Sequence, residues 1–318
     1  MKCTKCGGRA VISMPHHHVG LCKEHYLEWV PAQTERFIRK YAMFGKDDKI
    51  LVAISGGKDS LSLWDILKQL GYRANGLYID LGINGGVDYS RVSKEYALRF
   101  AEKIGSKLLI VDIFEETGKT IPEWARLDMR GKGKDCSVCG LVKRHEMNRI
   151  AQRLGYDVLA TGHNLDDEAA VLMGNTLNWS GDYLLRQGPV LPEEEGMTKK
   201  VKPLFRFYER EMTAYALLRG IDYIYEECPF SKNATSIQYK EVLNQIENAH
   251  PGVKHAFYLK FLEAKAGGLF NEKPGIHPVL HPCELCGQPT SAPGLCSFCR
   301  MVQKQQKPAN IAIHKETQ

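Results

Sequence analysis

A buried strand that runs through a glycine turn into a helix is the feature that most constrains this chain. The apolar segment 49–54, KILVAI, is followed by SGGKDS at 55–60 and then by the helical pattern LSLWDILKQLG. Adjacent glycines let a backbone approach a phosphate closely, and a helix N-terminus directs N–H groups at it. The spacing matches neither GxxxxGK[ST] nor GxGxxG. It predicts an anion-binding loop at a strand end.

Strands and helices alternate along the next hundred residues. Strand patterns cover 73–83, 106–113 and 156–161, while helical patterns cover 90–105 and 139–155. This alternation predicts an α/β fold with a parallel sheet covered on both faces. In such folds ligands lie at the carboxyl ends of the strands.

Polar and thiol side chains occur at several of these expected strand ends and connecting loops. They are Ser55, Asp80, Cys136 and the segment 161–167. We expect them to converge on one pocket.

The part of the chain after residue 191 is expected to be mainly helical up to a linker. The segment 192–200 is interpreted as a surface loop, a helix is expected after Pro203, and further helices are expected at 236–249 and 255–266. The sequence GGLFNEKPG at 267–275 is interpreted as a linker.

Composition narrows the class of protein. A chain of 318 residues can bury one full-sized core, and its net charge of +6 is compatible with polyanion binding without requiring it. No apolar stretch approaches the roughly 20 residues that span a bilayer, and the N-terminus does not resemble a signal peptide. We therefore expect a cytoplasmic protein without a membrane partner, whose ten cysteines serve metal or redox chemistry.

Seven cysteines and one histidine form two sets with the spacing of structural zinc sites. The first set reads C-x2-C…C-x2-H and the second C-x2-C…C-x2-C, each with four soft ligands in two close pairs. The ligands are Cys3, Cys6, Cys22 and His25 in the first set, and Cys283, Cys286, Cys296 and Cys299 in the second. Each module buries too little apolar surface to fold without its metal.

The two zinc modules divide the chain into three expected parts. These are an N-terminal zinc finger at 1–32, a catalytic domain at 33–270, and a C-terminal zinc finger and tail at 271–318. The adjacent residues His16, His17 and His18 are interpreted as a solvated loop, because three neighbouring rings do not converge readily on one ion.

Three cysteines remain. Cys136 and Cys139 open a helical pattern, and Cys228 precedes a proline, as the last ligand of some ferredoxin runs does. Three thiolates suit a [4Fe-4S] cluster with one open iron, a nucleophile with a disulfide partner, or a packed pair plus one buried cysteine. The residues alone leave all three interpretations open.

The stretch around the cysteine pair is the most basic in the chain. Its cations are Arg126, Arg130, Lys132, Lys134, Lys143 and Arg144. Such a stretch fits either a polyanionic substrate or an ordinary charged loop.

Together these motifs resemble the TtuA/Ctu group of tRNA 2-thiouridine synthetases, which are N-type ATP pyrophosphatases related to the TtcA cytidine thiolases. The resemblance covers nearly the whole chain: both zinc modules, SGGKDS at 55–60, CSVCG at 136–140, GHNLDDEA at 162–169, and Cys228. It implies a PP-loop domain of the adenine nucleotide alpha hydrolase type, a Rossmann-type fold, between zinc-binding modules. The paired terminal modules favour the TtuA branch.

The resemblance also implies the chemistry. ATP, with Mg2+, would adenylate the uracil C2 oxygen, and sulfur would then displace AMP. The [4Fe-4S] cluster would be held by Cys136, Cys139 and Cys228, and its open iron would receive sulfide from a ubiquitin-like thiocarboxylate protein. The resemblance further implies the tRNA substrate, a second copy in a homodimer and two structural Zn2+ ions.

By position, the ATP site would take in the glycine loop and two further strand ends. Its residues would be Ala53, Ser55, Gly56, Gly57, Lys58, Asp59, Ser60, Ile79, Gly162, His163 and Asp167. Lys143 would stabilise developing charge, and Asp59 and Asp167 would bind magnesium or position a proton. A solvated helix face is the competing interpretation for Lys143, and helix capping is that for the two carboxylates.

The expected activity is a tRNA-5-methyluridine 2-sulfurtransferase that forms 2-thioribothymidine in the T-loop. Thiolation of the wobble uridine is the nearest rival, because it uses the same chemistry. Two more distant rivals are a pyrophosphatase acting on a small molecule and a non-catalytic RNA adaptor built on the zinc modules.

Overall fold

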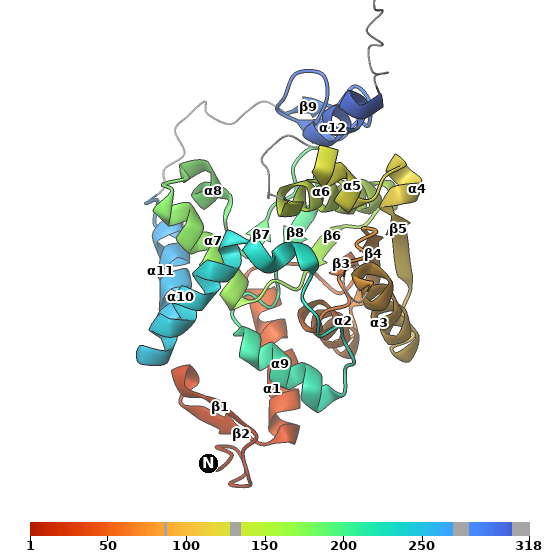
Figure 1. Ribbon diagram of the computed structural model, residues 1–318. Coiled ribbons are helices and arrows are strands. Elements are labelled where there is room, and N and C mark those ends of the chain that lie inside the picture. Colours follow the sequence, from red (N-terminus) through yellow and green to blue (C-terminus); the bar gives the residue numbers. More distant parts are fainter. Residues whose placement is uncertain (86–87, 128–134, 270–279, 307–318) are drawn as a thin grey trace, which may run out of the picture.

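A computed structural model of the chain describes residues 1–85, 88–127, 135–269 and 280–306. Its centre is a six-stranded sheet in the order β5-β4-β3-β6-β8-β7 (Figure 1). All neighbours are parallel except β7, which pairs antiparallel with β8. The strands are β3 (Lys49–Ile54), β4 (Arg73–Asp80), β5 (Leu108–Asp112), β6 (Val158–Thr161), β7 (Val190–Leu191) and β8 (Lys199–Val201). The predicted α/β fold with a mainly parallel sheet is confirmed.

Helices cover both faces of the sheet, which explains the apolar character of the strands. Ile50, Val52 and Ile54 pack on the face of α2 (Lys58–Gln69), and Leu51 packs on the opposite face with α6 (Asp135–Arg153). A strand buried on both faces needs apolar residues at nearly every position. The other helices of these two layers are α3 (Tyr89–Lys103) on the α2 side, and α4 (Ile113–Thr117) and α5 (Ile121–Leu127) near α6.

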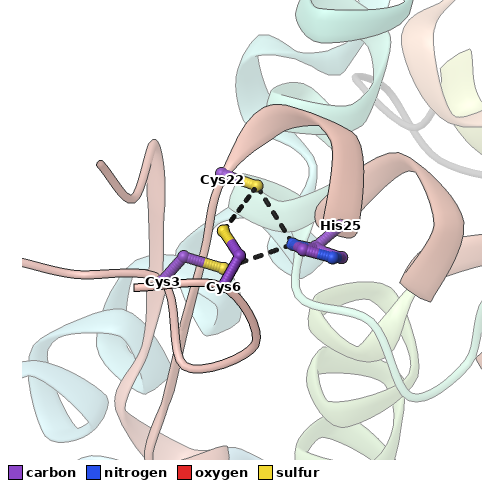
Figure 2. A group of neighbouring side chains, drawn as sticks. All are labelled: Cys3, Cys6, Cys22 and His25. Atoms are coloured by element: carbon purple, nitrogen blue, oxygen red, sulfur yellow. Dashed lines mark hydrogen bonds between the residues drawn. The ribbon is translucent and has the colours of Figure 1, made fainter. Parts of the chain in front are cut away.

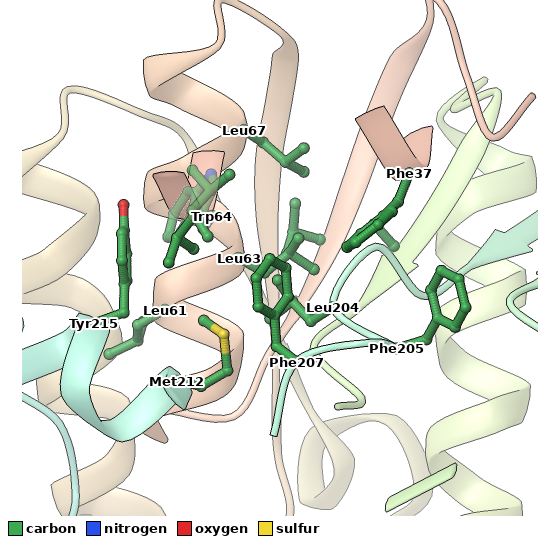
Figure 3. Packing of buried hydrophobic residues seen from close by; sticks show 14 of the residues in the cluster. Phe37, Leu61, Leu63, Trp64, Leu67, Leu204, Phe205, Phe207, Met212 and Tyr215 are labelled. Carbon is green, nitrogen blue, oxygen red and sulfur yellow. The ribbon is translucent and has the colours of Figure 1, made fainter. Parts of the chain in front are cut away.

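The larger core joins α2 to α1 (Lys23–Lys40) and α9 (Glu209–Arg219). Figure 3 shows Trp64 of α2, Phe207 and Met212 in this core, all of them buried. Trp64 Nε1 donates to the Ala74 carbonyl at 3.1 Å, so its one polar atom is satisfied inside the core. The irregular segment 203–208 before α9 is also largely buried. Helix α9 begins at Glu209, six residues after Pro203.

A third helical group packs beside β6. It consists of α7 (Leu165–Leu177), α8 (Gly181–Arg186), α10 (Thr235–Ala249) and α11 (Val253–Ala266). The last two confirm the helices predicted at 236–249 and 255–266. The predicted loop at 192–200 ends in β8, so its last two residues are strand rather than loop. The short helix η2 (Pro229–Asn233) follows Cys228.

The two terminal modules lie at opposite ends of the molecule in Figure 1. The N-terminal module contains β1 (Ile12–Met14), η1 (Pro15–His17) and β2 (Val19–Leu21); the C-terminal module contains β9 (His281–Pro282), β10 (Pro289–Thr290) and α12 (Ser297–Gln306). Helix α1 starts directly after Cys22 and continues beyond residue 32 into the catalytic core. The expected linker at 267–275 lies outside the described residues from position 270 onward. None of the helices described is long and apolar enough to cross a membrane.

The interpretation of His16, His17 and His18 as a solvated loop was wrong for the first two. The His16 side chain is only 2% exposed, and its Nε2 lies 3.1 Å from Glu211 Oε1. His17 packs edge-on against Trp29 and lies beside His255. Burial lowers the pKa of His255 to about 4, and the nearby Arg206 and histidines contribute. These rings therefore dock the N-terminal module on α9 and α11.

Candidate active site and metal centres

The order of the sheet places the glycine loop next to the segment that follows β6. From β3 the chain adds β4 and β5 on one side and then returns to add β6 on the other, so β3 and β6 flank a topological switch point. Ligands of open α/β sheets bind outside the carboxyl ends of strands at this point. A Cβ on Gly162 would lie 2.9 Å from the Ser60 Cα, so the two segments are in direct backbone contact. Residues 55–60 and 161–167 thus share one site, as expected.

The loop 55–60 has the geometry of an anion cradle. Gly56 adopts φ +77° and Gly57 is the N-cap of α2, so the helix N-terminus faces the switch point. The loop is braced internally, because Ser55 N donates to Ser60 Oγ at 3.1 Å and Gly57 N donates to Ser55 Oγ at 3.3 Å. It is also braced from outside, because Ile224 N donates to the Gly56 carbonyl at 3.0 Å.

Five charged side chains form a continuous ionic chain beside the loop. Lys58 Nζ contacts Asp59 at 3.1 Å and Glu209 at 2.8 Å. Lys240 Nζ contacts Asp167 at 2.6 Å and Glu209 at 3.2 Å. With three carboxylates against two ammonium groups, the ionised set carries one excess negative charge. An excess of carboxylate oxygens suits a divalent cation such as Mg2+.

The members of this chain differ in their tendency to ionise. Burial raises the pKa of Asp59 to about 6, with Lys58 opposing the shift and Asp167 adding to it. Burial also disfavours ionised Glu209, but Lys240 and Lys58 outweigh it and lower that pKa to about 2. Of Asp59 and Glu209, Asp59 is therefore the carboxylate whose charge is less compensated by the protein itself.

We expect Asp59→Asn to stabilise the nucleotide-free protein at pH 8. The folded pKa lies above the unfolded value of 3.8, so ionised Asp59 costs stability above pH 4 and costs it fully above pH 6. A shift of this size corresponds to at most about 3 kcal/mol. Urea unfolding at pH 8 and at pH 4.5 measures the gain, which should shrink at the lower pH. The exposed Asp182 provides a control, since Asp182→Asn should give no such gain; lower stability of Asp59→Asn at pH 8 would contradict the expectation.

The segment after β6 is ordered by local hydrogen bonds. Asn164 and Asp167 form a reciprocal capping box at the start of α7. Asn164 Nδ2 also donates to Asp59 Oδ1 at 3.3 Å, which links the two segments. His163 Nδ1 lies 3.0 Å from Thr161 Oγ1, and burial lowers the pKa of His163, which favours a neutral ring. Asp167 is thus a cap and a member of the ionic chain at once.

The other predicted strand-end residues occupy nearby but separate positions. Ala53 and Ile79 pack in the cluster on the α6 side of the sheet. Asp80 forms an ion pair with Lys94 at 2.6 Å, and it does not belong to the ionic chain. Of the basic stretch, Arg126 and Arg144 are exposed. The stretch also includes Arg130, Lys132 and Lys134, which lie outside the described residues.

The three remaining cysteines lie on two segments that contact each other. Cys136 and Cys139 lie in the first turns of α6, and Cys136 Sγ donates to the Phe230 carbonyl, two residues after Cys228, at 3.1 Å. Burial raises the pKa of the Cys228 thiol, and the nearby Cys139 adds to the shift. Lys143, one turn after Cys139, opposes this shift. Ile224, which braces Gly56, stands four residues before Cys228.

The spacing of these thiols distinguishes two kinds of metal site. A single tetrahedral zinc ion holds its sulfurs about 3.8 Å apart, given Zn–S bonds of about 2.3 Å. In the described part of the chain, two groups have all their ligand atoms within 4.8 Å of one another, and Cys136, Cys139 and Cys228 form neither. A set of three thiolates has the donor number of a [4Fe-4S] cluster with one open iron.

The N-terminal group has the geometry of a structural zinc site. Figure 2 shows Cys3, Cys6, Cys22 and His25 facing a common centre. Cys6 and Cys22 sulfurs are 3.9 Å apart, and His25 Nδ1 lies 3.2 Å from Cys22 Sγ and 3.5 Å from Cys3 Sγ. These separations match a tetrahedral ion.

The C-terminal group contains a histidine that the sequence did not indicate. The ligand atoms of Cys286, Cys296, Cys299 and His145 lie within 4.8 Å of one another. Cys283 is buried beside them, and its Sγ accepts the Cys296 N–H at 3.2 Å. Burial raises the pKa of the Cys283 thiol, but the backbone N–H groups of Cys296, Cys286 and Leu285 outweigh it and lower the pKa to about 6. Cys283 is therefore suited to be a metal thiolate.

Sequence reasoning missed three residues of these sites, namely Glu209, Lys240 and His145. None belongs to a spaced motif, and each reaches its site from a helix that is distant in sequence. The only local signal is the start of a helix at Glu209.

Comparisons with known proteins agree with this architecture. A family model for the N-terminal LIM domain of the 2-thiouridine synthetase TtuA matches residues 2–27, and a PP-loop domain model matches residues 30–235. The tRNA-5-methyluridine(54) 2-sulfurtransferase of Thermus thermophilus is 50% identical, over 95% of this chain and 91% of its own length. The protein of the same name from Thermotoga maritima is 44% identical, over 98% and 99%.

A solved structure extends the likeness to three dimensions. The U34-tRNA thiolase NcsA of Methanococcus maripaludis, solved with its [4Fe-4S] cluster, is 25% identical with a TM-score of 0.80 and covers 96% of each chain. The match spans both terminal modules as well as the sheet. Because the family models and the similar relatives cover most of its length, this chain belongs to the TtuA family of PP-loop proteins.

Proposed function

We propose that this protein is an ATP-dependent tRNA sulfurtransferase that converts the 5-methyluridine at position 54 to its 2-thio form. The observation that carries this proposal is that the segment carrying Cys228, one of the three thiols, also braces the loop 55–60 through Ile224. An anion cradle beside three metal-binding thiols suits a reaction that first activates an oxygen with ATP and then replaces it by sulfur. Relatives that are 43–50% identical bear the name of this activity.

The proposed reaction has two steps. The uracil C2 oxygen attacks the α-phosphorus of ATP, and pyrophosphate leaves. Sulfur at the sulfide level then adds to C2, the C2–O bond breaks, and AMP leaves with the oxygen. No atom of the uracil ring changes its oxidation state, so no external reductant is needed.

The ionic chain and the loop serve the first step. The N-terminus of α2 and the Lys58 ammonium stabilise the phosphates. Asp59 and Asp167 would offer oxygens to Mg2+, which when bound would compensate the charge of Asp59. Lys143, half-buried one turn after Cys139, neutralises charge that develops at the leaving oxygen.

The second step depends on the three cysteines. Cys136, Cys139 and Cys228 would hold a [4Fe-4S] cluster, which when bound supplies an open iron site for sulfide. The two terminal groups would each hold one Zn2+ with a structural role. The thiols of the active site lie on α6 and before η2, so their separation depends on how these two segments pack.

The partners follow from this chemistry. The sulfur is proposed to come from a ubiquitin-like protein with a C-terminal thiocarboxylate, and the working form is proposed to be a cytoplasmic homodimer. Wobble-uridine thiolation is the second candidate, because the NcsA structure with its cluster is named for position 34.

The deciding experiment is anaerobic incubation of the reconstituted protein with unmodified and 5-methylated tRNA, ATP, Mg2+ and sulfide. Nucleoside mass spectrometry with site mapping should find sulfur at position 54. Sulfur at position 34 would move the protein to the wobble branch. No sulfur in either tRNA, with iron present and pyrophosphate released, would reject tRNA thiolation.

A further inference from the structure

The helix that carries Cys136 and Cys139 also reaches the C-terminal metal group. His145 lies on α6 and is buried, and its Nε2 lies 3.4 Å from Cys286 Sγ. It contributes one of the four ligand atoms that lie within 4.8 Å of one another, whereas Cys286, Cys296 and Cys299 belong to the C-terminal module. A catalytic-domain side chain is therefore built into the metal group of the module.

Contacts on both sides fix the orientation of this ring. His145 Nδ1 lies 2.8 Å from Glu146 Oε1, and Arg149 Nε holds the other oxygen of Glu146 at 2.8 Å. Phe298 of α12 stacks on the imidazole with a centroid separation of 3.9 Å and an interplanar angle of 15°. The second nitrogen is thereby directed at the Cys286 sulfur.

The module can bind zinc without this histidine. Cys283 is available as the fourth thiolate, since its Sγ lies inside the module and accepts a backbone N–H. Four thiolates close the coordination sphere of a structural zinc ion. His145 then stands beside the complete site, with Nε2 facing the Cys286 sulfur and Nδ1 facing the Glu146 carboxylate.

We propose that His145 makes the C-terminal metal site a joint between the module and α6, so that zinc in the module positions the helix that carries Cys136, Cys139 and Lys143. A second contact supports the joint one turn later, where Asn148 Nδ2 donates to Gln288 Oε1 at 2.6 Å. His145 is a positioning residue in this scheme. Its importance for sulfur transfer rests on the proposed function, but the joint itself does not.

Hydrogen exchange on the full-length protein tests the joint without tRNA or ATP. In the wild type, removing zinc with a chelator should speed exchange in α6 by about tenfold, as expected for loss of the contact between His145 and the module. His145→Phe keeps a stacked ring but lacks Nε2. It should retain both zinc ions, show the faster exchange already in the zinc-loaded state, and respond little to the chelator.

The matched control is Gln152→Ala on the same helix. Gln152 bonds Thr198 rather than the module, at 2.8 Å, so its loss should leave the effect of zinc on α6 unchanged. Hydrogen exchange in α1, which follows Cys22, reports in the same sample whether the N-terminal zinc is bound. Iron retention after reconstitution gives a second readout, and it should fall with His145→Phe and not with Gln152→Ala.

Two results would overturn the proposal. In one, His145→Phe keeps the wild-type response of α6 to zinc, so the histidine does not transmit it. In the other, His145→Phe binds one zinc fewer, so the histidine is a ligand and the four cysteines do not form a complete site without it. Absence of tRNA thiolation in the wild type would reject the proposed function and leave both of these readouts intact.

Discussion

Cys228→Ser should abolish sulfur incorporation while sparing the activation of the nucleotide. A serine hydroxyl is a poor ligand for iron, and the two thiolates left would not hold the proposed cluster. We expect thio-uridine formation to fall by roughly 10³-fold or more, the range seen when a residue that acts as part of a unit is removed. Release of pyrophosphate from ATP should persist within a few fold, because the proposed role of Cys228 lies in the second step. Nucleoside mass spectrometry and a pyrophosphate assay measure the two steps separately.

Ser231→Ala is the matched control for this segment. Ser231 Oγ donates to the Cys228 carbonyl at 2.7 Å, so its loss perturbs the backbone of Cys228 and leaves the thiol in place. We expect this variant to keep its iron and most of its sulfur transfer. Full thiolation by Cys228→Ser would contradict the assignment of Cys228 to the cluster, and loss of pyrophosphate release would show that the cysteine acts in the first step instead.

Gly56→Ala should disable the nucleotide loop and destabilise the fold. Gly56 adopts φ +77°, and a Cβ there would lie 2.3 Å from the Ser93 carbonyl oxygen. The left-handed conformation alone costs a residue with a Cβ about 1–2 kcal/mol, and the backbone clash forces the loop to move. We expect ATP binding to weaken by roughly 100-fold or more, since the phosphate cradle depends on this backbone.

Gly71→Ala is the matched control, because it carries the cost of the left-handed conformation without a clash. Gly71 adopts φ +75°, nearly the same value, but a Cβ added there would meet nothing within 4 Å. Urea unfolding should therefore show a loss of about 1 kcal/mol for Gly71→Ala and at least about 2 kcal/mol more for Gly56→Ala. Isothermal titration with ATP should find Gly71→Ala unchanged. Equal effects of the two substitutions on both stability and ATP binding would contradict the close approach of Gly56 to Ser93.

The features that could be predicted from sequence are local ones. The strand at 49–54, the loop 55–60 and the helix after it follow from residue types that stand next to one another. The same holds for the N-terminal metal group, whose ligands come in two close pairs. Periodicity also located α10 and α11 within a few residues.

The features that could not be predicted depend on contacts between distant segments. Glu209 and Lys240 complete the ionic chain from α9 and α10, and no spacing in the sequence relates them to Lys58. His145 reaches a metal group 141 residues away. The histidines at 16 and 17 were misplaced for the same reason, because their buried surroundings come from α9 and α11. Short strands such as β8 are not predicted, because three residues are too few to show the alternation of a strand.

The continuous helix α1 has a consequence for the order of events on the ribosome. Tyr26, in the first turn after Cys22, is fully buried and donates to the Glu211 carbonyl, a partner 185 residues later in the chain. At about 5–20 residues per second, the ribosome needs roughly 10 to 40 s to deliver that partner. During this interval the nascent N-terminal knuckle already holds all four of its metal-binding side chains but lacks the surface that covers its apolar face. Zinc bound early would keep the N-terminal knuckle folded during this interval. The metal would thereby limit aggregation of the nascent chain.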